Sequence, residues 1–294
     1  MKASLFLAFI SLSSICCACR TEKSTPLPDR ITLGTLNMEW FGDNSADDHK
    51  PRSEADDELL AVVLGDIDAD VLAVQEVENE QALKRLLLHT AEESGSEYHF
   101  VLGASGGKQK VGFLYRKPVE LVSVREVDAI AVEKGRTRAG LLALFRVGSF
   151  EWAMLAVHLK STARADSTPE LMQRSLALRT AQAAEILSFT NSFQQTTLSK
   201  PFFILGDFND SPRKKRTTLD TLKHSPNLTF LTEDLASCSY SGLLGIDHII
   251  SSSSATARVL HGTLHTVNFR AMLPEKVAER VSDHCPVVLQ FSPR

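Results

Sequence analysis

Short stretches of apolar residues, rich in the β-branched and aromatic types that favour strands, recur along the chain from Ile31 onward. Several of them are apolar throughout, which is typical of strands that are covered on both faces. The pattern therefore predicts ten strands, at residues 31–37, 70–76, 98–103, 111–116, 119–124, 141–147, 152–159, 201–209, 245–250 and 286–291.

Helical spacing of apolar residues appears in only three segments, at residues 54–64, 80–93 and 170–189. In the last of these, Leu171, Leu178 and Ile186 step along one surface. Because the predicted strands outnumber the helices about three to one, we expect an α/β protein whose sheets pack together with the helices outside. The chain beyond Ile31 contains no internal repeat and no second linker, which favours one domain over residues 31–294.

The first 30 residues differ from the rest of the chain. Residues 1–18 start with a basic residue, continue with an apolar stretch too short for the roughly 20 residues of a membrane-spanning helix, and end in small residues, which is typical of an export signal. The run around Cys19 resembles a bacterial lipobox, so we expect a lipid on Cys19, with plain secretion as the alternative. Residues 19–30 are polar and contain two prolines, as a tether would.

Composition and charge exclude several classes of protein. With 43% hydrophobic and 23% charged residues among 294, the chain is neither disordered nor a polytopic membrane protein. The formal net charge of -4 means that an anionic partner must be bound by a local basic patch or by a metal ion. Only Cys238 and Cys285 remain outside the N-terminal segment, which is not a disulfide scaffold; we favour two free thiols over a disulfide between them.

Polar residues suited to metal or phosphate chemistry stand at the ends of many predicted strands. Taken singly, such residues are more often turn formers than ligands, but eight of them are harder to explain in that way. The set consists of Asn37, Glu76, His158, Asp207, Asn209, Asp247, Asp283 and His284.

The chemistry of this set is consistent. Oxygen atoms of Glu76, Asp283 and Asn37 are hard ligands, which suit Mg²⁺, Mn²⁺ or Ca²⁺. A histidine oriented by a carboxylate can act as a general acid or base, and the chain offers His158 and His284 for that purpose. A hard metal together with carboxylates and oriented imidazoles indicates hydrolysis of a phosphate ester.

Six segments carry a resemblance to a known family: TLNMEW (35–40), VQEVEN (74–79), HLKS (158–161), LGDFND (205–210), GIDHII (245–250) and SDHCPV (282–287). In this order they resemble the motifs of the endonuclease/exonuclease/phosphatase superfamily of metal-dependent phosphoesterases, over about Ile31 to Gln290. The resemblance implies a four-layer sandwich of two packed mixed β-sheets flanked by helices. It also implies Mg²⁺ as the cofactor, with Mn²⁺ or Ca²⁺ as alternatives.

The resemblance assigns a role to each residue of the set. Glu76 would be the principal metal ligand, supported by Asn37 and Asp283, and Asp247 would fix the tautomer of His284. Asp207 and Asn209 would orient or activate the attacking water and bind the phosphate oxygens. His158 would stabilise the pentacovalent phosphorane or assist the leaving oxygen. The identity of the general base stays open.

Several further residues have two readings. Lys160 and Arg138 are candidate contacts to the substrate phosphate, whereas the alternative for Lys160 is a solvated residue at a strand end. The basic run at residues 213–216 could bind a phosphodiester backbone, although we favour an exposed start of a helix. His248, next to Asp247, is expected to be structural.

The functional prediction is an extracytoplasmic nuclease, because residues 108–110, 135–138 and 213–216 provide local positive charge on an acidic protein. The first alternative is a phospholipid or sugar-phosphate phosphodiesterase or phosphatase, sphingomyelinase-like members included, and the second is a surface protein that binds without catalysis. We expect a nucleic acid as the partner, a monomer as the oligomeric state, and contact with a membrane only through a lipid at Cys19.

Overall fold

Two six-stranded β-sheets form the centre of the molecule in the computed structural model, which describes residues 27–162, 166–197, 200–239 and 243–294. The predicted export signal (1–18) and most of the predicted tether (19–30) lie outside the described residues. The first sheet has the order β11-β12-β1-β2-β4-β3 and the second the order β5-β6-β7-β8-β10-β9. The pairs β1–β2 and β7–β8 are parallel while all other pairs are antiparallel, so both sheets are mixed.

The strands of the first sheet are β1 (Ile31–Phe41), β2 (Val71–Val77), β3 (Tyr98–Leu102), β4 (Lys110–Arg116), β11 (His265–Thr266) and β12 (Val287–Phe291). Those of the second are β5 (Glu120–Val127), β6 (Gly140–Val147), β7 (Phe150–His158), β8 (Phe202–Asp207), β9 (Leu228–Phe230) and β10 (Asp247–Ser252). The helical segments are α1 (Glu54–Ile67), α2 (Glu80–Ser94), the 3-10 turn η1 (Asp128–Ile130), α3 (Pro169–Thr196), α4 (Asp220–Lys223), α5 (Ser253–Thr256), α6 (Phe269–Met272) and α7 (Glu275–Val281).

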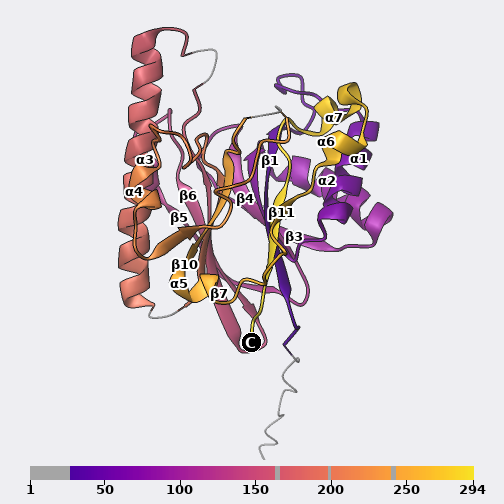
Figure 1. Ribbon diagram of the computed structural model, residues 1–294. Helices are drawn as coiled ribbons and strands as arrows, with labels where there is room; N and C mark the ends of the chain where they lie inside the picture. Colours follow the sequence, from indigo (N-terminus) through magenta and orange to yellow (C-terminus); the bar gives the residue numbers. More distant parts are fainter. Residues whose placement is uncertain (1–26, 163–165, 198–199, 240–242) are drawn as a thin grey trace, which may run out of the picture.

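The helices cover the outer faces of the two sheets. Figure 1 shows α3 and α4 on one side of the paired sheets and α1, α2, α6 and α7 on the other. Three apolar clusters follow from this order: one between the sheets, one between the first sheet and its helices, and one between the second sheet and α3 and α4. The expected four-layer sandwich is confirmed.

Strand β7 shows why the sequence produces these layers. Its alternating side chains Trp152 and Met154 enter the cluster between the sheets, whereas Ala153 and Leu155 enter the cluster beneath α3. All four are fully buried, so the strand is apolar on both faces and lacks the alternation of a half-exposed strand.

All ten predicted strands and all three predicted helices are present, with shifts of up to seven residues at their ends. The sequence pattern missed β9, β11 and the short helices α4 to α7. Strands of two or three residues and helices of one or two turns are too short to show a period of their own.

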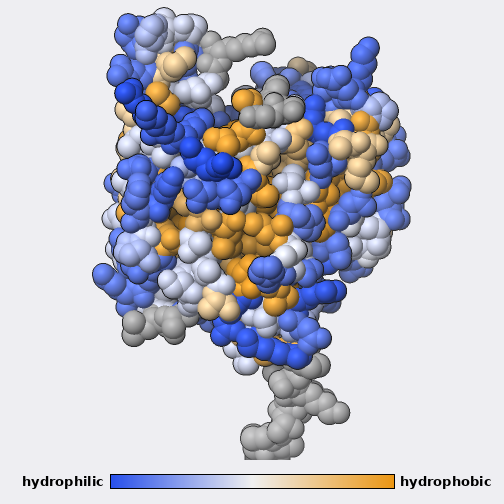
Figure 2. Space-filling view, in the orientation of Figure 1, coloured by the Kyte–Doolittle hydropathy of each residue, from blue (hydrophilic) through white to orange (hydrophobic). Residues whose placement is uncertain are grey.

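One face of the sandwich exposes apolar side chains. Figure 2 shows them gathered at the centre of the view, where Figure 1 places β10 and β11. Among the partly buried residues that pack against the intersheet cluster are Leu231, Leu235, Val259 and Leu264. The intersheet core therefore extends into the loops that close its edge. No helix in the described part of the chain has the length and apolarity needed to cross a membrane.

The preference for free thiols is wrong, because Cys238 and Cys285 form a disulfide with their Cα atoms 6.1 Å apart. Cys285 stands just before β12, and Cys238 lies in the loop between β9 and β10. The two residues are 47 positions apart in the sequence, and the folding of that loop onto the start of β12 is what brings them together.

Candidate active site

Three of the predicted residues lie at one level of the second sheet. His158 on β7 and Asp247 on β10 are both register partners of Asp207 on the central strand β8. Their positions follow from backbone pairing across three neighbouring strands, which is the most rigid support that the fold offers.

Glu76 reaches the same place from the first sheet through an irregularity. The pairing of β2 shifts register on both sides, between Asn37 and Phe41 of β1 and between Val74 and Val77 of β2. Glu76 lies in this bulge with a φ of 61°. A non-glycine residue in the left-handed region is strained, and bulges with such strain commonly re-aim a side chain towards a site.

The Glu76 carboxylate is held at both oxygens. Its Oε2 accepts a hydrogen bond from the Trp40 backbone N–H at 3.0 Å, and its Oε1 accepts one from Asn37 Nδ2 at 3.2 Å. Asn37 Nδ2 also donates to Asp207 Oδ2 at 3.1 Å, while Asn37 Oδ1 accepts from the Glu39 N–H at 2.9 Å. In this arrangement the amide nitrogen of Asn37, and not its oxygen, faces the two carboxylates.

Asp207 is buried at the centre of the site. Its Oδ1 accepts from the Asn209 backbone N–H at 2.7 Å, and its Oδ2 accepts from Asn209 Nδ2 at 3.0 Å. Burial raises the pKa of Asp207 to about 7, an effect that the His284 ring opposes and the carboxylates of Asp247 and Glu76 reinforce. A carboxyl group with such a pKa can accept and release a proton near neutral pH.

The chain on either side of Asp207 has unusual backbone angles. Asn209 has a φ of 52°, and its Nδ2 also donates to the Leu159 carbonyl at 3.2 Å, which ties the end of β8 to the end of β7. Gly206 has a φ of 148°, and a Cβ placed there would lie 1.9 Å from the Val157 carbonyl oxygen. Only glycine allows β7 and β8 to approach this closely.

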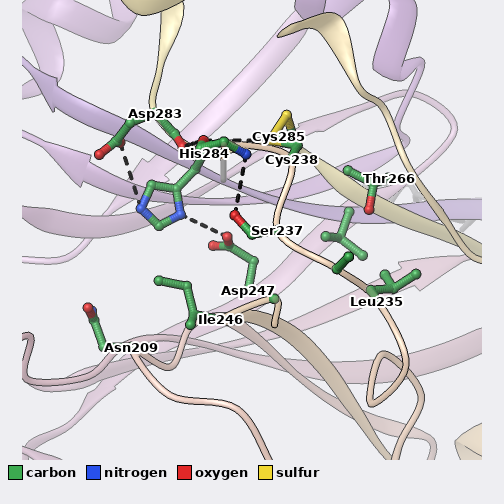
Figure 3. A pocket seen from close by; sticks show the side chains of 14 residues that line it. Asn209, Leu235, Ser237, Cys238, Ile246, Asp247, Thr266, Asp283, His284 and Cys285 are labelled. Carbon is green, nitrogen blue, oxygen red and sulfur yellow. Dashed lines mark hydrogen bonds and ion pairs between the residues drawn. A yellow bond between two sulfur atoms is a disulfide. The ribbon is translucent and has the colours of Figure 1, made fainter. Parts of the chain in front are cut away.

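His284 pairs with Asp247, as Figure 3 shows. The distance from His284 Nδ1 to Asp247 Oδ2 is 2.7 Å, and His284 Nε2 lies 3.9 Å from Asp207 Oδ2 and 3.7 Å from Asp283 Oδ1. Burial alone would lower the pKa of His284, but the Asp247 carboxylate, with Asp207 and Asp283, raises it well above its usual value. The ring is therefore held as a cation at neutral pH, with Nε2–H facing Asp207.

His158 has the opposite environment. Its Nδ1 contacts Nη1 of Arg138, and its Nε2 lies 3.5 Å from Asp207 Oδ2 and 3.7 Å from Glu76 Oε1. Burial, and then the positive charge of Arg138, lowers the pKa of His158 well below its usual value. Because guanidinium only donates, Nδ1 must accept and Nε2 must carry the hydrogen, so His158 is a neutral donor aimed at the carboxylates.

Asp283 lies at the exposed side of the site. Half of its side chain is exposed, and its backbone N–H donates to Glu39 Oε2 at 2.8 Å. The three predicted metal ligands therefore lie in two places: Asp283 is next to His284, whereas Glu76 and Asn37 are next to Asp207.

A second group of acids stands apart from the predicted metal ligands. Among the described residues, Asp43, Asp48 and Glu78 place their oxygens within 4.8 Å of one another, close enough to hold a metal ion. Glu78 also pairs with Lys108 at 2.9 Å. This group was not predicted from the sequence.

Two cavities open onto the site. The first, of about 230 Å³, is lined by Asp247, His284 and the disulfide, and Figure 3 shows the disulfide on one wall and Asn209 on the opposite side. The second, of about 750 Å³, is lined by Glu76 together with Trp40, Ser105, Gly106, Gly107, Gln109, Gly135, Arg136, Thr137, Arg138, Lys160, Ser161 and Asp166. Both weaker candidates, Arg138 and Lys160, face this second cavity, and Lys160 is not solvated because only 13% of its side chain is exposed.

The other basic segments have different surroundings. Residues 213–216 are exposed and form a turn before α4, which begins at Asp220, so the expected helix start lies four to seven residues too early. Lys108 and Lys110 donate to Asp47 and to the Glu78 carbonyl, and Gln109 between them is the residue that reaches the second cavity. His248 is structural as expected: it is fully buried, with its two ring nitrogens at Thr232 Oγ1 (2.9 Å) and the Asp210 carbonyl (3.0 Å).

Sequence reasoning missed two positioning contacts. Ser282 Oγ donates to the Asn37 carbonyl at 2.8 Å and accepts from the His284 N–H at 3.0 Å, which joins the two ends of the site. Arg138 was predicted as a phosphate contact and not as the partner of His158. The antiparallel register of β6 and β7, in which Leu141 faces Ala156, would place Arg138 opposite Leu159 if it continued, so strand pairing alone does not give that contact.

Comparisons with known proteins show the family and the fold. The profile of the Endonuclease/Exonuclease/phosphatase family matches residues 34–284. No curated protein matches the sequence. Many solved structures share the fold.

Three of these structures are given as examples. TDP2 from C. elegans has 13% identity and a TM-score of 0.62, covering 90% of this chain and 75% of that one. TDP2 from D. rerio, complexed with a single-strand DNA product, has 15% identity and a TM-score of 0.61, covering 90% and 100%. A mannosyl-6-phosphatase from Bacteroides thetaiotaomicron has 16% identity and a TM-score of 0.58, covering 88% and 98%. At these identities the similarity shows the fold alone.

Proposed function

The chain belongs to the endonuclease/exonuclease/phosphatase family, whose members hydrolyse phosphoesters, and from that premise we propose that it is a metal-dependent nuclease that acts outside the cytoplasm. The observation that carries the proposal is the convergence of a buried carboxylate, a cationic histidine and a neutral histidine on one point. Asp207 Oδ2 lies 3.9 Å from Nε2 of His284 and 3.5 Å from Nε2 of His158.

The donor set around this point fits a hard divalent cation. Glu76 Oε1 and Asp207 Oδ2 come from different sheets, yet both accept from Asn37 Nδ2 and both face His158 Nε2. Two carboxylates that converge in a buried place repel each other, and a cation offsets that repulsion. We propose Mg²⁺, with Mn²⁺ or Ca²⁺ as alternatives, held mainly by Glu76. Support from Asn37 requires its side-chain amide to turn so that Oδ1 replaces Nδ2 at the carboxylates, and support from Asp283 would come from the side of His284.

The metal would polarise a phosphoryl oxygen and offset the charge that develops on the leaving oxygen. The protein's own groups supply the remaining steps. Asp207, fixed by Asn209, faces the point where an attacking water would lose its proton, and the charged His284, fixed by Asp247, faces the same point as a proton donor. The Nε2–H of His158 is aimed to donate a hydrogen bond to a non-bridging phosphoryl oxygen.

The substrate is proposed from the lining of the second cavity. Arg136, Arg138 and Lys160 line it, and cationic side chains are what a phosphodiester backbone requires. The D. rerio structure with a single-strand DNA product shows that the fold can hold such a ligand. A sugar phosphate is the second candidate, which the similarity to the mannosyl-6-phosphatase supports, and a phospholipid is the third.

The proposed location rests on two independent features. The N-terminal segment has the pattern of an export signal, with Cys19 as the residue that would carry a lipid. The Cys238–Cys285 disulfide is typical of proteins in oxidising compartments.

The proposal is tested by incubating the protein with plasmid DNA, RNA, sphingomyelin and mannose 6-phosphate, each with Mg²⁺ and with EDTA. We expect cleavage of nucleic acid that EDTA abolishes. Faster turnover of the lipid or the sugar phosphate would replace the nuclease proposal with one of its alternatives. If no substrate is hydrolysed, the protein is not a hydrolase of these esters and the non-catalytic alternative stands.

A further inference from the structure

The second cavity carries more positive charge than one scissile phosphate requires. Arg138 is engaged with His158, so it belongs to the reacting centre. Arg136 and Lys160 line the same cavity, but among the described residues they form no hydrogen bond or ion pair with Glu76, Asp207 or either histidine of the centre.

These two cations are held in place by one buried carboxylate. Asp166, of which 6% is exposed, lies 3.2 Å from Lys160 Nζ and 3.9 Å from Arg136 Nη2, and it also accepts from Ser175 Oγ at 2.9 Å. The Lys160 backbone N–H donates to Gln182 at 2.8 Å, which fixes the strand end beneath them. The arrangement is a built one, with rigid cations at the wall and their carboxylate behind them.

The neighbouring charges leave the wall net positive. Glu133 lies 3.4 Å from Arg136 Nε and is shared with Arg174 at 2.8 Å. Among the described residues that line the cavity, three cations (Arg136, Arg138 and Lys160) face two carboxylates (Glu76 and Asp166). A metal ion on Glu76 would increase the excess, so an anion is the ligand that this wall favours.

Glycine backbone also lines the cavity. Gly107 and Gly135 line the cavity with φ angles of 61° and 76°, and a Cβ added to either would meet nothing within 4 Å. Trp40 adds an aromatic edge beside Glu76. With a volume of about 750 Å³, the cavity has room for more than a single phosphate group.

We propose that Arg136 and Lys160 bind a second phosphate group of the substrate, one that neighbours the scissile phosphate along a nucleic-acid strand. This inference rests on the proposed nuclease function and specifies its substrate as a chain with at least two phosphates. It makes Arg136 and Lys160 residues that determine specificity, separate from the reacting centre.

The test uses dinucleotides that differ by one phosphate. Thymidine dinucleotide is compared with its 5′-phosphorylated and 3′-phosphorylated forms, and kcat/KM is measured for each with the wild-type protein and with Arg136→Gln. Wild type is expected to prefer one of the phosphorylated forms by about tenfold or more, the usual value of a hydrogen bond to a charged group. Arg136→Gln is expected to lose most of that preference.

The matched control is Arg146→Gln, an exposed arginine on β6 whose partner is Glu120 and which does not line the cavity. This variant removes the same charge and should keep the wild-type preference. A second readout is binding of a non-hydrolysable phosphorothioate oligonucleotide in EDTA at several salt concentrations. Loss of one phosphate contact should reduce the slope of log affinity against log salt by about 0.7 in Arg136→Gln.

The outcomes separate the two proposals. If the wild-type protein cleaves neither the dinucleotides nor longer nucleic acids, the proposed function fails. If wild type cleaves all three forms equally well, or if Arg136→Gln keeps the full preference and the full salt slope, the nuclease function stands and the second phosphate site is wrong.

Discussion

The two histidines of the site have opposite neighbours. His284 has a carboxylate behind its ring, since Asp247 lies 2.7 Å from its Nδ1. His158 has a guanidinium behind its ring, since Arg138 contacts its Nδ1. The first pKa is raised and the second is lowered, although both rings point their Nε2 atoms at Asp207.

The difference shows that the residue bound at Nδ1 of an imidazole determines whether Nε2 can release a proton or only donate a hydrogen bond. A ring that is charged can give a proton away, whereas a ring that is held neutral by an arginine can only donate a hydrogen bond. The supports differ as well. His158 is the last residue of β7 inside a sheet, while His284 stands in the turn before β12, next to the disulfide.

The largest effect should come from His284→Ala. Because this variant removes the only one of the two rings that is charged at neutral pH, we expect kcat to fall by about 10³-fold, within the usual range for general acid–base catalysis. The folded signal in circular dichroism should be unchanged. A variant that keeps more than a tenth of wild-type kcat would contradict the proton-handling role of His284.

The double variant Cys238→Ser with Cys285→Ser tests whether the disulfide holds His284 in position. Loss of a native disulfide typically costs about 2–4 kcal/mol of unfolding free energy, measurable by urea titration. At a temperature where the variant stays folded, we expect its activity to fall only because His284 is held less firmly. We therefore expect the double variant combined with His284→Ala to be no slower than His284→Ala itself, and a further loss would show that the disulfide acts elsewhere.

In a third histidine, His248, the effect of burial on the pKa outweighs the opposite effect of Asp210 and Asp247. Burial lowers the pKa of His248 to about 4, so the unfolded chain binds its proton more readily than the folded one. The stability that follows is complete above about pH 6.5 and is lost as the pH falls towards 4; at pH 5 the loss is about 2 kcal/mol. Urea unfolding of wild type and His248→Gln at pH 7.5 and pH 5 should differ in pH dependence by that amount, and parallel profiles would refute the assignment.

The smallest effect should come from Arg138→Gln. A glutamine amide can still donate to Nδ1 of His158, so the ring keeps its tautomer but loses the positive charge behind it. We expect a loss of about tenfold in kcat/KM, the value of one charge-assisted hydrogen bond. Arg138→Glu should be more harmful, because it would make Nδ1 the protonated nitrogen. Equal activity of the two variants would mean that the tautomer of His158 does not matter.

The sequence allowed much of this arrangement to be predicted. Strands buried on both faces have a strong apolar signal, and the polar residue that ends such a strand stands out against it, as His158 and Asp207 do. The layers and the set of site residues were therefore available from the pattern and the resemblance. Whether each residue has the predicted role stays a prediction.

Other features depend on contacts that no local pattern contains. The pairing of Cys238 with Cys285 follows from how a long loop folds back onto β12. The bulge that aims Glu76 follows from how β1 and β4 pair with β2 on either side, and VQEVEN alone reads as an ordinary strand end. Short elements such as β11 exist only because a neighbouring strand offers them an edge.

Gly206 has a consequence for how the gene can vary. Its φ of 148° and the Val157 oxygen, 1.9 Å from the place of a Cβ, exclude every side chain from the position next to Asp207. In a saturation library selected only for folded protein, codon 206 should return glycine alone, while the neighbouring codon for Asp207 should tolerate small polar residues. Selection for activity would then restrict both codons, and the difference between the two screens would distinguish a residue demanded by the architecture from one demanded by the reaction.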